Sequence, residues 1–193
     1  VTETASFSIT AYDLVGLTDS DTSNYFSIID ETPPEITIVA PTITSSIPEY
    51  EELTVFWDAT DNIEMSDSSR IYYSNDAGSS FIKMDGPSFS VPAGVTDVAQ
   101  IKVVALDIYN NEGEALSDYF SVTDNTPPTV IINTPGILSI GNQYQISWSG
   151  SDNTGFSSHE LFYSKEVGGA YLPIISVDGS FNTHIWTVPN IVT

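Results

Sequence analysis

The sequence predicts an all-β protein built from antiparallel β-sandwiches in tandem. Short segments in which apolar and polar residues alternate are separated by Gly, Pro, Asn and Asp, a pattern typical of strands joined by turns. A block of sequence also occurs twice, because residues 25–34 return at 119–128, an offset of 94 residues. The repeated unit is therefore about 94 residues long, a common size for one sandwich.

The strands of one complete unit follow from the alternation. Leu53, Val55 and Trp57 fall on one face of an extended segment, and Thr54 and Phe56 fall on the other. No segment has a convincing helical period. We expect strands near residues 35–40, 51–58, 69–75, 79–84, 88–92, 98–107 and 116–123.

Two tryptophans stand in matching contexts. Trp57 lies in the segment 55–62, and Trp148 lies in the similar segment 146–153. Both indoles fall in the inward phase of their predicted strands. We therefore expect them to be buried and equivalent core residues of two units.

Asp-x-Thr-Pro-Pro linkers divide the chain. Residues 1–30 are expected to form the C-terminal strands of a partial repeat, 31–124 a complete repeat, and 125–193 the N-terminal part of a further repeat. The prolines fix φ and restrict the residue before them, so these linkers should be short and stiff. The two partial segments together have about the length of one unit.

Neither partial segment can close a core alone, since each would expose an apolar face and an unpaired edge. Neighbouring sequence in a longer protein could supply the missing strands. Alternatively, the N-terminal strands of one copy could complete the C-terminal sandwich of the next by strand addition. A fragment of a larger array is the more ordinary explanation. Strand addition would pack Ile9, Ala11, Phe26 and Ile28 against Ile146, Trp148 and Trp186 of another copy.

Charge and composition exclude several classes of function. The chain has 26 acidic and 4 basic residues, a net charge of −22, so nucleic acid and anionic membranes would be repelled. Cysteine is absent, which excludes disulfides, thiol catalysis and Cys-ligated zinc. No stretch of eighteen apolar residues occurs, so we expect no membrane insertion.

No catalytic motif is recognisable, and the expected protein is not an enzyme. Its two histidines, His159 and His184, lie outside any visible Asp-His-Ser constellation and are expected at the surface or on edge strands. An aromatic face for stacking on surface glycans is a second binding hypothesis. Its candidate residues are Tyr72, Tyr73, Phe162, Tyr163 and Trp186.

A cation site, with calcium as the expected ion, is predicted where a linker meets a sandwich. In a seven-strand sandwich, the loops after the second and sixth strands lie at the pole where the linker arrives. Calcium takes six to eight oxygen ligands from carboxylates, amides and carbonyls. Asp and Asn also favour turns, so plain turn chemistry is the alternative. The candidate ligands are Asp30, Glu31, Asp58, Asp61, Asn62, Asp107, Asn110, Asn111 and Glu112.

Three features together resemble the immunoglobulin-like and fibronectin type III-like repeats of bacterial and archaeal cell-surface proteins. They are the Pro-rich linker, the turn from Trp57 to Asn62, and the hairpin segment Tyr73-Ser74-Asn75-Asp76-Ala77-Gly78. The last repeat departs from this pattern in its hairpin, where it has Lys165-Glu166-Val167-Gly168.

This resemblance implies tandem sandwiches of the immunoglobulin or fibronectin type III kind at an extracellular cell surface. It implies a structural role in an S-layer, an extracellular filament or an adhesin stalk, with other copies or neighbouring repeats of the same protein as partners. The alternative is a carbohydrate-binding accessory module of a secreted enzyme. Fold alone does not choose between these roles, because sandwiches host many functions.

Overall fold

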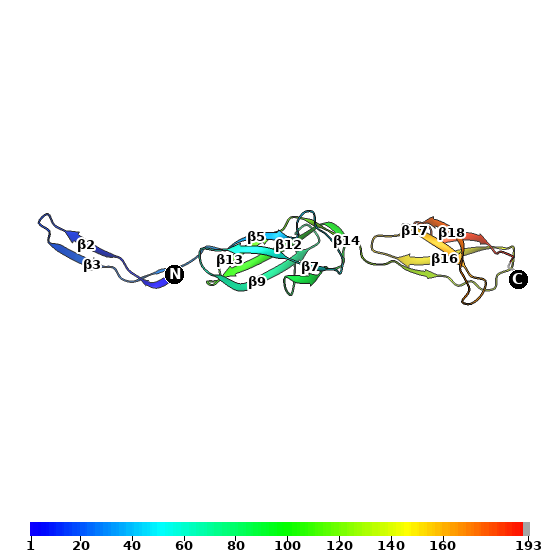
Figure 1. The fold of residues 1–193 in the computed structure, drawn as a ribbon, viewed down its shortest axis with the longest axis horizontal. Coiled ribbons are helices and arrows are strands. Elements are labelled where there is room, and N and C mark those ends of the chain that lie inside the picture. Colours follow the sequence, from blue (N-terminus) through cyan, green and yellow to red (C-terminus); the bar gives the residue numbers. More distant parts are fainter. Residues whose placement is uncertain (191–193) are drawn as a thin grey trace. The chain divides into compact units, whose positions relative to one another are not determined.

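The computed structural model describes residues 1–190, and all the regular structure in that range is β-strand (Figure 1). The prediction of an all-β fold is confirmed. No helix in the described range is long and apolar enough to cross a membrane.

The chain divides into two compact units. Unit 1 comprises residues 1–45, 52–89 and 98–120, and unit 2 comprises residues 46–51, 90–97 and 121–193. Both units draw on residues 31–124, so the repeat boundaries stay a prediction of the sequence.

Unit 1 begins with a hairpin whose side chains are mostly exposed. Strand β2 (Ser8–Tyr12) pairs with β3 (Thr18–Thr22), and β1 (Thr2–Ala5) pairs with β4 (Phe26–Ile28), both antiparallel. We call residues 1–29 the N-terminal hairpin. It contains four short strands.

The other strands of unit 1 form the larger part of its core. Strand β5 pairs with β8, β7 with β11, and β12 with both β9 and β13, while β10 extends the sheet beyond β9. These strands, which lie wholly or mostly in unit 1, are β5 (Glu35–Ala40), β7 (Glu52–Thr54), β8 (Phe56–Thr60), β9 (Met65–Ser74), β10 (Ile82–Lys83), β11 (Ser88–Ser90), β12 (Thr96–Asp107) and β13 (Glu112–Leu116).

The predicted strand at 51–58 is in fact two strands, β7 and β8. The amide of Val55, between them, donates to the carbonyl of Pro87. Because β7 pairs with β11 and β8 pairs with β5, the chain changes sheets at this point. The predicted strand at 116–123 is likewise divided, because it takes in Leu116, the last residue of β13, and the whole of a separate strand at Phe120–Thr123.

The core of unit 1 follows the predicted alternation. Leu53 and Val55 are buried, while Phe56 is exposed, and Trp57 is only partly buried. In β12, Ile101 and Val103 are fully buried. The expected burial is therefore seen in full for the aliphatic residues and in part for Trp57.

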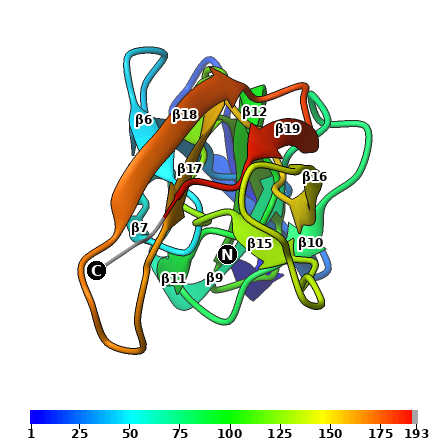
Figure 2. The ribbon, with the colours of Figure 1, turned by 90° about the vertical axis from the view of Figure 1, so that its right-hand side faces the viewer.

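Unit 2 contains β6 (Ser46–Pro48), β14 (Phe120–Thr123), β15 (Thr129–Ile132), β16 (Gln143–Ser151), β17 (Ser158–Tyr163), β18 (Leu172–Asp178) and β19 (Thr183–Thr187). Strand β14 pairs with β6 in parallel. Strand β16 lies between β15 and β19, whereas β17 pairs with β18 (Figure 2). A small core of Ile146, Trp148 and Leu161 forms here, which confirms the predicted burial of Trp148.

Candidate cation site

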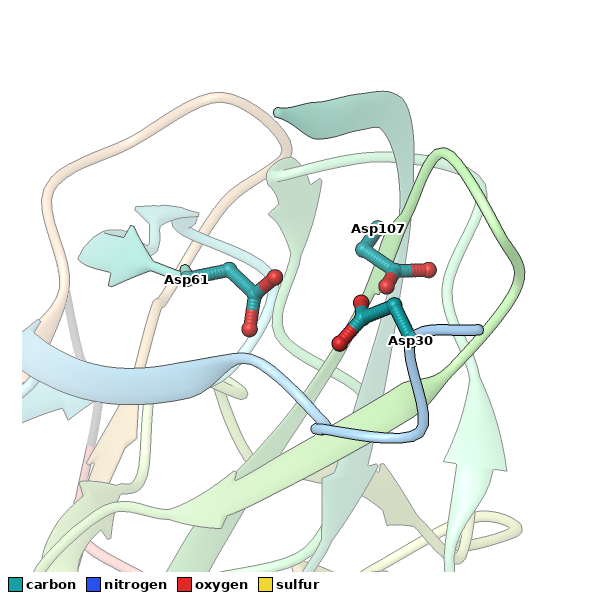
Figure 3. Close-up of side chains that lie close together, drawn as sticks. All are labelled: Asp30, Asp61 and Asp107. Carbon is teal, nitrogen blue, oxygen red and sulfur yellow. The ribbon is translucent and has the colours of Figure 1, made fainter. Parts of the chain in front are cut away.

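Three carboxylates of unit 1 converge at one end of its strands (Figure 3). Asp30 belongs to the linker, Asp61 follows β8, and Asp107 ends β12. One carboxylate oxygen from each lies within 4.8 Å of the others. Calcium–oxygen distances of about 2.3–2.6 Å allow two ligands of one ion to lie up to about 5 Å apart, so this spacing fits a calcium ion.

Asp107 is held rigidly by the turn that follows β12. It is 1% exposed, and its Oδ1 accepts hydrogen bonds from the amides of Tyr109 and Asn111, each at 2.8 Å. Asn110 occupies the left-handed region of this turn, with φ 68°, a conformation that Asn tolerates well. The turn therefore fixes the carboxylate that faces the linker.

Asp30 is bound by the side chains of two loops. Asn62 Nδ2 donates to its Oδ1 at 3.1 Å, and Asn111 Nδ2 lies 3.3 Å from its Oδ2. The hydrogen bond from Asn62, followed by the one from the amide of Thr32, lowers the pKa of Asp30 against the opposing effect of desolvation. The linker carboxylate is therefore charged at neutral pH.

Asp61 has an unsatisfied oxygen. Its Oδ2 accepts from the amide of Ile63 at 3.0 Å, but its Oδ1 is buried and has no hydrogen-bond partner among residues 1–190. A buried acceptor without a partner is costly, and each one calls for an explanation. An ion between the three carboxylates would satisfy this oxygen.

Five of the nine candidate ligands lie together at this end of unit 1. They are Asp30, Asp61, Asn62, Asp107 and Asn111.

The remaining four candidates have other surroundings. Glu112 pairs with Arg70 at 2.5 Å, and Asn110 shapes the turn. Asp58 is exposed within β8, and Glu31 is exposed in the linker.

A related arrangement occurs in unit 2 around the second linker. Asp124 and Asp152 both accept a hydrogen bond from Thr154 Oγ1, at 2.7 and 2.9 Å. Asp152 Oδ1 is buried without a partner among the described residues, as Asp61 Oδ1 is. The backbone hydrogen bond from Thr126, followed by the one from Thr154, lowers the pKa of Asp124.

Sequence reasoning missed Glu49, which supports this second linker. Glu49 is 1% exposed, and its carboxylate accepts from Gly94 N at 3.0 Å, from Asn153 Nδ2 at 2.7 Å and from Thr126 Oγ1. The bond from Thr126 contributes most to lowering the pKa of Glu49. No repeat or motif in the sequence distinguished this glutamate from the other 25 acidic residues.

The aromatic candidates do not form one exposed face. Tyr73 is 1% exposed, and Tyr163 packs against Trp186 with ring centroids 5.2 Å apart. His159 packs between Trp148 and Phe156, at 5.3 and 4.8 Å. These ring contacts contribute to side-chain packing within unit 2.

The described residues have an all-β fold of mostly antiparallel strands. A solved structure of Clostridium thermocellum CbhA fibronectin(III)-like modules aligns with the chain at a TM-score of 0.35 and 17% identity, over 80% of this chain and 79% of that one. No family model matches the sequence. No curated protein matches it either.

Proposed function

We propose that this chain is a non-catalytic structural segment of an extracellular cell-surface assembly, in which calcium stiffens the linkers between sandwiches. An S-layer, a filament and an adhesin stalk all need such segments. The observation that carries the proposal is the position of linker residue Asp30. Its carboxylate is hydrogen-bonded by the side chains of Asn62 and Asn111 and lies close to the carboxylates of Asp61 and Asp107.

Stiffening follows from the positions of these residues. The linker contributes one carboxylate and the folded loops contribute two, so an ion bound to all three would tie the linker to the loops. Without the ion, three carboxylates within 4.8 Å repel one another, and the asparagine amides offset only part of this repulsion. The high negative charge of the chain also favours cation binding.

Thermal unfolding with and without calcium tests the site. Millimolar calcium should raise the melting temperature and EDTA should lower it, because an ion bound only to the native state stabilises that state. Asp61→Asn should abolish the response, whereas Asp58→Asn, outside the cluster, should retain it. A melting temperature indifferent to both additions would remove the site from the proposal.

Stiffness needs its own measurement. The absence of cysteine allows spin labels to be placed at Ser27→Cys in the N-terminal hairpin and Ser68→Cys in β9 without background labelling. Calcium should narrow the distribution of distances between the labels, and Asp61→Asn should prevent the narrowing. An equally broad distribution in calcium and in EDTA would contradict a stiffening role.

A further inference from the structure

Three of the four basic residues in the chain lie on one side of one sheet. Lys83 in β10 lies opposite Tyr72 in β9, and Tyr72 lies opposite Lys102 in β12. Arg70 stands two residues before Tyr72 in β9. Residues directly opposite each other in an antiparallel pair, and residues two apart in one strand, point to the same side of a sheet. The fourth basic residue, Lys165, belongs to the turn after β17.

This side of the sheet faces away from the core of unit 1. Ile71 and Tyr73 in β9, and Ile101 in β12, alternate with the basic residues and are at most 2% exposed. Leu116 in β13, directly opposite Lys102, is 54% exposed. We call the outward side of these strands the basic face, which comprises Arg70, Tyr72, Lys83, Lys102 and Leu116.

Aromatic rings hold one ammonium group of the basic face in position. Lys102 Nζ lies 5.1 Å from the ring centroid of Tyr72 and 4.9 Å from that of Phe81, distances at which a cation is attracted to the face of an aromatic ring. A side chain fixed in this way loses little conformational entropy when a partner binds. The charge of Lys102 is therefore preorganised for binding.

The positive charge of this face is only partly neutralised within the chain. Arg70 pairs with Glu112 at 2.5 Å, and Lys102 Nζ lies 3.9 Å from a carboxylate oxygen of Glu114. Lys83 is exposed and makes no ion pair among residues 1–190. With three cations against these two carboxylates, the face keeps a positive charge on a chain that is otherwise strongly acidic.

Strands β5 and β8 carry carboxylates on their exposed side. Thr37 in β5 lies opposite Asp58 in β8, and Glu35 stands two residues before Thr37. All three residues are exposed, and neither carboxylate makes an ion pair within the described range. Ile38 and Trp57, on the other side of the same strands, are partly buried. The two carboxylates therefore point outward from unit 1.

Apolar side chains accompany these carboxylates. Val39 in β5 is 53% exposed, and Phe56 in β8 is 58% exposed. Apolar residues beside charged ones suit a protein interface, whose centre is apolar and whose rim is polar. We call the outward side of β5 and β8 the acidic face, which comprises Glu35, Thr37, Val39, Phe56 and Asp58.

We propose that the basic face of one copy of this chain packs on the acidic face of a second copy. The two faces have opposite charges, and both expose apolar side chains. Because the contact joins unlike faces, it is heterologous, and each added copy offers a free face to the next, so the contact can repeat in an open row. This inference rests on the proposed function, because it names the surfaces through which copies in the assembly meet.

A second copy fits the basic face better than an anionic glycan does. Leu116 adds an apolar contact beside the cations, and the acidic face supplies Val39 and Phe56 to cover it. The chain also carries its own complementary charge, because it has 26 acidic residues against 4 basic ones. One sheet face gives a weak contact, but the same contact repeated along an assembly is strengthened by a high effective concentration.

Sedimentation equilibrium of the full chain tests the contact. At about 0.15 M salt the Debye length is about 8 Å, so repulsion between whole chains is screened while charges in direct contact still attract. Lys83→Glu should weaken association about tenfold, because an attractive pair becomes a repulsive one. Asp58→Lys should weaken association as well, although it lowers the net negative charge of the chain.

Lys165→Glu is the matched control for net charge. It changes the net charge by the same amount as Lys83→Glu but lies outside both faces, so association should stay close to that of the native chain. Equal weakening by the two lysine variants would overturn the proposal. Stronger association of Asp58→Lys than of the native chain would do the same, because net charge alone would then explain the results.

Chemical crosslinking tests which faces meet. Glu114 lies on the basic side of β13, because it is opposite Val104, which is in turn opposite Arg70. The single-cysteine variants Glu114→Cys and Thr37→Cys are mixed with a short bismaleimide, and a heterodimer identified by mass spectrometry is expected. The control mixture of Thr37→Cys with Asn75→Cys, in the exposed turn after β9, should give much less. Equal heterodimer yields from the two mixtures would contradict packing of these faces.

Two further outcomes separate this proposal from its neighbours. Polygalacturonate that binds the chain through Lys83, with no association between copies, would overturn the proposal in favour of an anionic glycan. A chain that stays monomeric while its melting temperature still responds to calcium would overturn the contact between faces and leave the proposed function standing.

Discussion

The side-chain amide of Asn111 lies 3.2 Å from the carbonyl oxygen of Asp30, so a turn after β12 holds the backbone of the linker. The same amide donates to Asp107 Oδ2 at 2.8 Å. One short side chain therefore joins the linker to the most buried carboxylate of the candidate cation site.

Replacing Asn111 should loosen this junction. Asn111→Leu introduces the residue that the N-terminal hairpin has at the equivalent position, Leu17, and removes the donor to Asp107. We expect a loss of about 1–3 kcal/mol, because a buried acceptor loses its partner. Urea unfolding measures the loss. Asn75→Ala, at an exposed asparagine, is the control, and equal stability of the two variants would show that the amide contributes nothing.

The two equivalent tryptophans should differ in their contribution to stability. Trp148 is 6% exposed, and Trp148→Ala should cost roughly 3–5 kcal/mol through lost burial and a new cavity. Trp57 is only partly buried, so Trp57→Ala should cost less. Denaturant unfolding of both variants checks the order. A larger loss at Trp57 would contradict the burial described above.

Gly113 should tolerate no side chain. The added Cβ would meet the carbonyl oxygen of Pro34 at 2.0 Å, and backbone cannot yield as a flexible side chain does. We expect Gly113→Ala to destabilise unit 1 by about 1–3 kcal/mol, the usual cost of overpacking. Gly86→Ala is the matched control, because a Cβ there meets nothing within 4 Å. Indistinguishable melting temperatures for the two variants would contradict this close approach.

Acid should weaken the turn between β9 and β10. Hydrogen bonds from Ser80 and Ser74 lower the pKa of Asp76 to about 2. Since this folded-state pKa lies below the unfolded value near 3.9, the contribution is fully present above about pH 4 and is lost as the pH falls towards 2. The stability difference between the native chain and Asp76→Asn should therefore narrow over that range, as measured by urea unfolding at a series of pH values. A difference independent of pH would contradict the lowered pKa.

Part of the candidate site could be anticipated because its residues follow predicted strands. Asp107 ends one alternating segment and Asp61 lies just beyond another, and the strands of a sandwich bring such ends to a common pole. Glu49 could not be anticipated in this way. Its importance depends on burial beside Gly94, Thr126 and Asn153, which are 45 to 104 residues away in the chain. No local pattern encodes these contacts.

Periodicity and repetition along the chain were enough to predict the all-β class, the strand phase of residues such as Ile101 and Val103, and the correspondence of residues 1–30 to the end of the complete repeat. The place where β7 gives way to β8, the carboxylates that meet, and the exposure of equivalent side chains became known from the three-dimensional structure alone. Burial and ligand geometry depend on distances between segments far apart in the chain. Phe7 and Ile101 illustrate the difference, because the amide of each donates to the hydroxyl of a serine 16 residues later, and yet only Ile101 is buried among the described residues.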